Sequence, residues 1–134
     1  MDKNTFSDPK VVKYINEKYY AVKLDAESKK SITVGTKVYN FDASKRANEA
    51  AIALLGGKMS YPSLVYLDET FNMIQPVPGY MEAKPFHELI TFFGENYHKK
   101  LNFEEYKKST YVLNFETPKK WIHFKKNLFK IVLF

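Results

Sequence analysis

Residue types that perform chemistry are sparse in this sequence, and none stands at a catalytic or metal-binding spacing. The chain has no cysteine, which excludes thiol catalysis, disulfides and thiolate metal sites within it. His87 and His98 lie three helical turns apart without accompanying carboxylates, so we interpret them as surface residues. Asp25 and Asp68 each stand at the end of a predicted strand, where a turn or capping role is favoured. We therefore expect no cofactor and no metal site.

The most informative stretch is 60–68, which reads SYPSLVYLD. Its second half, Ser63–Leu67, is apolar and rich in strand-forming residues, so it predicts a buried strand that ends at Asp68–Glu69. Pro62 stands at the entrance of this strand, where its missing N–H does least damage to the hydrogen-bond ladder. An aromatic residue before proline also raises the chance of a cis peptide bond.

Helical spacing predicts a helix near each end of the central region. Ser7-Asp8-Pro9 is a capping signal that begins the first helix, which we expect to end near 16–18. Lys84-Pro85 begins the last one. The predicted apolar faces are Val11, Val12, Ile15 and Tyr19 in the first helix, and Phe86, Leu89, Ile90, Phe93 and Tyr97 in the last. A short extra helix is expected within 101–111.

A third helix is predicted between them, with Asp42 or Ser44 as its cap and Gly56 as its left-handed stop. Its buried stripe consists of small and aliphatic residues, namely Ala47, Ala50, Ala51, Leu54 and Leu55. Alanines on this stripe allow the helix to approach a sheet closely.

Two further strands and a hairpin complete the expected elements. The strands are Tyr20–Asp25 and Phe71–Val77, and prolines in and after the second limit it to a sheet edge or to a short length. Ser31–Phe41 predicts a hairpin or an irregular extended excursion around Gly35-Thr36, which we interpret as an insertion at the sheet edge. A plain surface hairpin is favoured over a partner-binding edge.

The order of these elements resembles the C-terminal half of the thioredoxin-like fold. In that family a cis-proline opens the strand after the second helix, a hairpin follows, and a glycine precedes the last helix; Pro62 and Gly79 match these positions. The opening MDKNTFSDPKVVKYINEKYYAVKLDAE also resembles the segment after the redox motif in disulfide-isomerase-related members. The resemblance covers residues 1–108 and implies an α/β fold, a mixed sheet flanked by helices, and a cis Tyr61–Pro62 bond.

The chain departs from that family at its start. The hallmark Cys-x-x-Cys motif and the strand before it have no counterpart, because the matching residues begin at Met1. We therefore expect an N-terminally shortened thioredoxin-like domain, 1–108, with a basic and aromatic extension, 109–134.

The charge of the chain is concentrated in this extension. The net charge is +6, and five of the 21 basic residues follow Pro118 with no acid among them. The rest of the chain carries 16 basic against 15 acidic residues, so nucleic-acid binding is not expected. Weak membrane-surface binding or self-association through Lys119–Phe134 stays open.

The end of the extension has two interpretations. An amphipathic helix is slightly favoured by the regular apolar stripe that starts at Trp121. The alternative rests on the resemblance, which implies that the missing first strand lies between the strands matching Tyr20–Asp25 and Ser63–Leu67. Lys130–Phe134 would then form a substitute strand at this position, from its own chain or a neighbouring one. That gap would otherwise expose unpaired backbone groups, each costing roughly 1–3 kcal/mol when buried.

Two classes of function remain open at this point. The resemblance implies a domain of the thiol-disulfide oxidoreductase type, which is expected to be redox-inactive as given because it has no thiolate. The alternative is a non-catalytic binding module that holds a protein or peptide at Ser60, Tyr61 and Pro62, or through the tail. The compartment depends on the natural start of the chain: cytoplasmic as given, exported if a signal peptide lies upstream.

Overall fold

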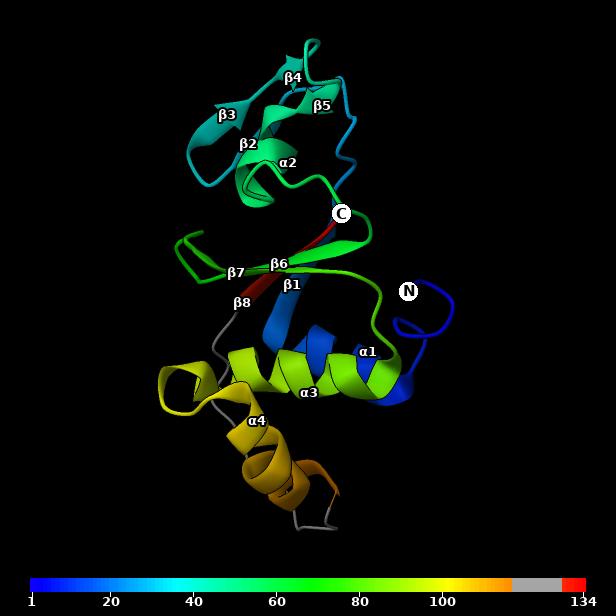
Figure 1. Cartoon of the computed structure of the whole chain (residues 1–134), viewed down its shortest axis with the longest axis vertical. Helices are drawn as coiled ribbons and strands as arrows, with labels where there is room; N and C mark the ends of the chain where they lie inside the picture. The colour runs from blue at the N-terminus through cyan, green and yellow to red at the C-terminus, as the bar shows by residue number, and fades with distance from the viewer. Residues whose placement is uncertain (117–128) are drawn as a thin grey trace. The chain divides into compact units, whose positions relative to one another are not determined.

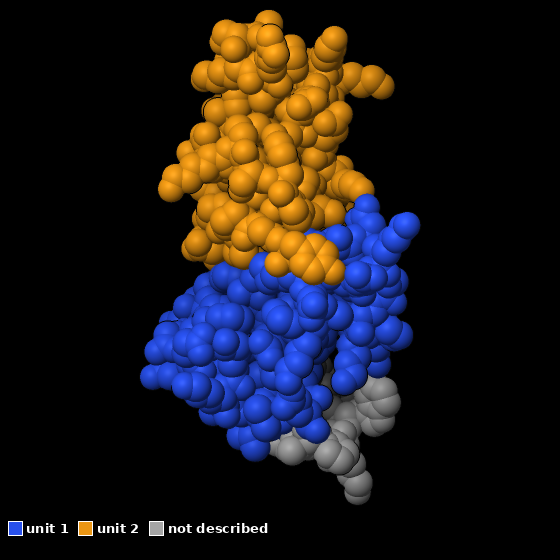
Figure 2. Space-filling view, turned by 45° about the vertical axis from the view of Figure 1, so that its right-hand side comes forward, with its two compact units in different colours: residues 1–19, 81–128 blue, residues 20–80, 129–134 orange. Residues whose placement is uncertain are grey.

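A computed structural model describes residues 1–116 and 129–134. It shows an α/β protein with a four-stranded mixed sheet and about four helices. The chain forms two compact units (Figure 2): residues 1–19 with 81–128, and residues 20–80 with 129–134.

The sheet has the order β1-β8-β6-β7 (Figure 1). Its strands are β1 (Tyr19–Lys23), β8 (Phe129–Leu133), β6 (Ser63–Leu67) and β7 (Met73–Pro78). All five residues of β6 are buried, as the apolar run predicts, and β6 pairs antiparallel with both β7 and β8. β7 contains Pro76 and Pro78 and is an edge strand, also as predicted.

The C-terminal residues form the strand β8, which lies between β1 and β6 (red in Figure 1). Val132 pairs with Val65 in the middle of the ladder, and the N–H of Leu24 donates to the carbonyl of Leu133 at 2.8 Å. The hypothesis of a substitute central strand is therefore confirmed, and it comes from the same chain. The favoured helical interpretation is wrong for residues 129–133. The edges of β1 and β6 both carry backbone N–H and C=O groups that need partners, and this segment supplies them as a strand. The rest of the predicted helical stripe, from Trp121 to Leu128, lies outside the described residues.

The predicted hairpin is present as β2 (Ile32–Val34) and β3 (Lys37–Tyr39), antiparallel with Ile32 opposite Tyr39. It is a separate two-stranded sheet, so its placement at the edge of the main sheet is corrected. A second small pair follows, β4 (Phe41–Asp42) with β5 (Ala47–Asn48).

The middle helix, α2 (Glu49–Leu54), begins later than predicted. Its cap is Asn48, whose Oδ1 accepts from the N–H of Ala50 at 3.0 Å while its Nδ2 donates to two carbonyls of the 28–30 loop. Asp42 instead caps a turn, accepting from the N–H groups of Ser44 and Lys45. Both aspartate and asparagine suit a cap, and only the pairing of β4 with β5 decides between them.

The core of the second unit joins α2 to the sheet. Its buried members are Leu54, Leu55, Val65, Leu67 and Val132, with Leu24, Val34 and Phe134 packed against them. Residues from β8 are thus part of the core and not an external addition.

In the other unit, α1 (Pro9–Lys18) packs on α3 (Ala83–Gly94). Asp8 caps α1 as predicted, accepting from the N–H of Lys10 at 2.9 Å. Val12, placed on the apolar face by sequence, is exposed, and Tyr14 is buried in its place. Gly94 allows this packing, because a Cβ there would lie 2.7 Å from the Tyr14 hydroxyl.

The last described helical segment is longer than predicted. It runs from η1 (Tyr97–Lys99) into α4 (Phe103–Tyr106) and then into η2 (Lys107–Glu116), a ten-residue π-helix. Long π-helices are rare. Here Tyr111 of η2 is buried, and Phe115 stacks against it at 5.3 Å between ring centroids.

Candidate functional site

Four segments meet at one end of the four-stranded sheet, around Pro62. The N–H of Gly79, after β7, donates to the Pro62 carbonyl at 2.8 Å. On the other side, Phe134 and Ser63 exchange both backbone hydrogen bonds, at 2.9 and 3.4 Å. Leu24 bonds to Leu133, so the end of β1 reaches the same place. We call this the Pro62 end of the sheet.

Gly79 has a backbone requirement here. Its φ is +102°, a region that side chains disfavour, and in that conformation its N–H faces Pro62. The peptide bond between Tyr61 and Pro62 is cis, as expected. The loop before β6 is therefore held from both neighbouring strands.

Ser60 fixes the shape of this loop. Its carbonyl accepts from the buried Ser63 hydroxyl at 2.6 Å, and the two hydroxyl oxygens lie 3.3 Å apart. Its own N–H donates to the Lys58 carbonyl. The contact of Ser60 with a partner stays a prediction; the observed bonds show that Ser60 positions the residues beside it.

Tyr61 is the residue that this loop presents to solvent. Its side chain is 53% exposed, although the adjoining β6 is wholly buried. Its backbone N–H and C=O form no hydrogen bond to the part of the chain that the structure describes. Partial burial raises the pKa of Tyr61, and the charges of Glu27 and Asp25 raise it further. The site thus offers an aromatic ring, a donor and an acceptor in one rigid loop.

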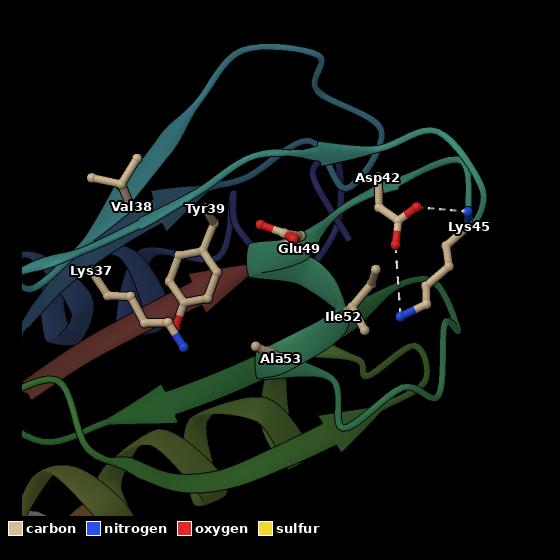
Figure 3. Close-up of a pocket in the computed structure, with 8 residues that line it drawn as sticks. All are labelled: Lys37, Val38, Tyr39, Asp42, Lys45, Glu49, Ile52 and Ala53. Atoms are coloured by element: carbon tan, nitrogen blue, oxygen red, sulfur yellow. Dashed lines mark hydrogen bonds and ion pairs between the residues drawn. The ribbon is translucent and has the colours of Figure 1, made fainter.

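A separate pocket of about 320 Å³ lies between the β2–β3 hairpin and α2 (Figure 3). It is lined by Lys37, Val38, Tyr39, Asp42, Lys45, Glu49, Ile52 and Ala53. Both of its carboxylates already have partners: Asp42 is bound by Ser44 and Lys45, and Glu49 by the N–H of Asn40. Figure 3 shows the Lys45 amine directed at the Asp42 carboxylate. The pocket therefore makes a weaker candidate than the Pro62 end.

A buried polar cluster in the other unit was missed by sequence reasoning. His87, expected at the surface, is only 6% exposed, and its Nδ1 lies 2.9 Å from the Tyr111 hydroxyl. Burial lowers the pKa of His87 to about 4. The signal was present in the helical spacing, since His87, Thr91 and Gly94 form a second stripe beside the aliphatic one, and all three are buried.

The same unit contains a second polar contact. The Tyr14 hydroxyl donates to Glu95 Oε1 at 2.7 Å, and the ammonium of Lys18 lies 3.4 Å from the same oxygen. The carboxylate is thereby satisfied by two groups of α1. Burial, followed by the charge of Glu95, raises the pKa of Tyr14. This arrangement joins α1 to the end of α3, and its members are too enclosed to meet a substrate.

No group of three or more histidine or acidic residues is placed to hold a metal ion within residues 1–116 and 129–134. None of the helices in those residues is long and apolar enough to cross a membrane. Comparisons with models of protein families, with curated proteins and with solved structures found no match.

Proposed function

We propose that this chain is a thioredoxin-like domain without thiol chemistry of its own, which holds an extended peptide at Tyr61 and Pro62. The observation that carries the proposal is the presentation of Tyr61. An exposed ring and an unused backbone N–H and C=O stand directly at the start of a buried strand.

This combination suits recognition of an extended peptide by the loop itself, because β6 is already paired on both sides. An extended peptide bonds through its main chain, which gives affinity, while a neighbouring side chain gives selectivity. The loop that carries Tyr61 is held by Gly79 and Phe134, so little conformational entropy is lost when a peptide binds. The absence of cysteine leaves binding, and not disulfide exchange, as the activity of the site.

The proposal is tested by selecting binders from a random heptapeptide library displayed on phage. Synthetic versions of the enriched peptides are then measured by fluorescence anisotropy. Tyr61→Ala should weaken binding by about tenfold or more, as expected for an aromatic anchor. The matched control is Tyr20→Ala, which removes a tyrosine of similar exposure, 58%, near the opposite end of β1. Equal binding by wild type and Tyr61→Ala, or no enrichment at all, would exclude the proposal.

A further inference from the structure

We infer that the peptide held at the Pro62 end is cationic, with Lys or Arg beside an apolar residue; the inference rests on the proposed function. The first step is the position of two acidic residues, Asp25 and Glu27, which belong to the segment that follows β1. Leu24 and Ser63 bond to consecutive residues, Leu133 at the end of β8 and Phe134 directly after it. They are therefore separated by two strand spacings, about 10 Å. Asp25 follows Leu24 directly and Tyr61 precedes Ser63 by two residues, so both belong to the same end of the sheet.

The second step is that these acids are not neutralised. Asp25 Oδ1 accepts only from the N–H of Glu27, at 2.9 Å, and the Glu27 side chain has no hydrogen bond or ion pair among the described residues. Lys29 and Lys30 follow in the same loop, yet neither forms an ion pair with them within residues 1–116 and 129–134. Both carboxylates are exposed, and their charges act on the Tyr61 hydroxyl.

The third step concerns the chemistry of recognition. The exposed ring of Tyr61 accepts an apolar side chain on its face and also attracts a cation by cation–π interaction. Met59, which is partly exposed in the same loop, adds apolar surface. An apolar residue flanked by Lys or Arg satisfies the ring and the acids together, whereas an acidic peptide would be repelled.

The net charge of the whole chain, +6, has the opposite sign to the two acids, so the two sources of charge predict opposite effects of salt on binding. If the overall charge governed binding, a cationic peptide would be repelled and its affinity would rise with salt. If the two acids govern binding, the affinity falls as salt is added. Salt screens the attraction between exposed charges, with a Debye length of about 10 Å at 0.1 M. The salt dependence therefore separates the local field from the global one.

The experiment uses three fluorescein-labelled nonapeptides with blocked ends and the same Val-Phe-Val core, flanked by Lys, Gln or Glu. Anisotropy titrations are made at low and at high salt with the full chain. We expect the Lys-flanked peptide to bind about tenfold more tightly than the Glu-flanked one at low salt, with the difference shrinking as salt rises. Glu27→Gln should weaken the Lys-flanked peptide by about threefold and leave the Gln-flanked peptide unchanged.

The matched control is Glu69→Gln, which removes the same charge at the opposite end of β6 and should change nothing. If all three peptides bind alike and Tyr61→Ala abolishes binding, the inference is overturned and the proposed function stands. If Tyr61→Ala has no effect, or no peptide binds, both are overturned.

Discussion

His87 shows how a single residue can differ from its sequence interpretation. A histidine without metal-ligand companions is usually at the surface, yet this one is enclosed by Tyr14, Tyr111 and Phe115. The π-helix η2 supplies two of these rings. The His87 ring is neutral near pH 7, because burial favours the uncharged form. The charge of Lys10 also lowers the pKa of His87, and the smaller effect of Asp8 raises it.

This burial predicts a pH dependence of stability. The ordinary pKa of histidine is about 6.5, and that of folded His87 is about 4. Between these values the unfolded chain binds a proton that the folded chain does not. The free energy of unfolding should therefore fall as pH decreases through this window, by up to about 1.4 kcal/mol per pH unit, and then level off.

Urea unfolding at pH 7, 5.5 and 4.5 measures this slope. His87→Gln should reduce it. His98→Gln is the control and should leave most of the slope in place, because His98 is less deeply buried. An unchanged slope in His87→Gln would show that other groups cause the acid sensitivity.

Among the elements, β8 contributes to both the sheet and the core, so we expect the stability of the fold to depend on it. It pairs with β6 over four residues and contributes Val132 to the core, while β1 bonds to it on the other side. Lys130 strengthens its position, because its ammonium donates to the Glu69 carbonyl at 2.8 Å and lies 4.3 Å from the centre of the Phe71 ring.

Removing β8 should therefore abolish cooperative unfolding. Deletion of 130–134 unpairs β1 and β6, and several buried unpaired groups approach the whole stability of a small domain, about 5–15 kcal/mol. The milder change Val132→Asp buries an uncompensated charge and should cost roughly 3–5 kcal/mol.

Thermal melting followed by circular dichroism measures both variants. Val38→Asp is the control, because Val38 is exposed and the new carboxylate stays in water. A deletion variant that melts cooperatively near the wild-type temperature would contradict the central role of β8.

At the scale of the whole molecule, the lack of cysteine excludes thiol chemistry within this chain. Disulfide exchange requires attack by a thiolate, and no residue of this chain provides one. We predict that the chain neither reduces insulin disulfides nor oxidises a reduced peptide. Insulin turbidity in dithiothreitol, compared with a buffer control, measures the first activity, and turnover above that control would contradict the prediction.

The two compact units are each built from two separate stretches of the chain. The first stretch of the first unit ends at Tyr19, the first residue of β1, and residues 129–134 belong to the second unit, where they pair in the sheet. The predicted division at residue 108 follows family resemblance and stays a prediction. Contacts group the chain differently, since a terminal strand belongs with whichever edges it pairs.

The sequence by itself determined the elements whose signals are local. The Asp8-Pro9 cap, the buried run Ser63–Leu67 and the turn at Gly35-Thr36 all appear where predicted, because capping, burial on both faces and turn geometry depend on adjacent residues. The loop at Tyr61 was predicted from the resemblance of its surroundings to the thioredoxin-like fold, and its role in binding stays a prediction.

Only the tertiary structure decided which competing local option was used. Asn48 caps α2 in place of Asp42 because Asp42 and Ala47 are paired in the β4–β5 ladder and α2 begins after it, and His87 is buried because η2 covers it. The C-terminal residues form a strand because two edges, from β1 and β6, require a partner. The nearness of Asp25 to Tyr61 has the same origin, because Leu24 and Ser63, beside them in the sequence, bond to Leu133 and Phe134. Such pairings depend on distant segments, and local patterns carry no information about them.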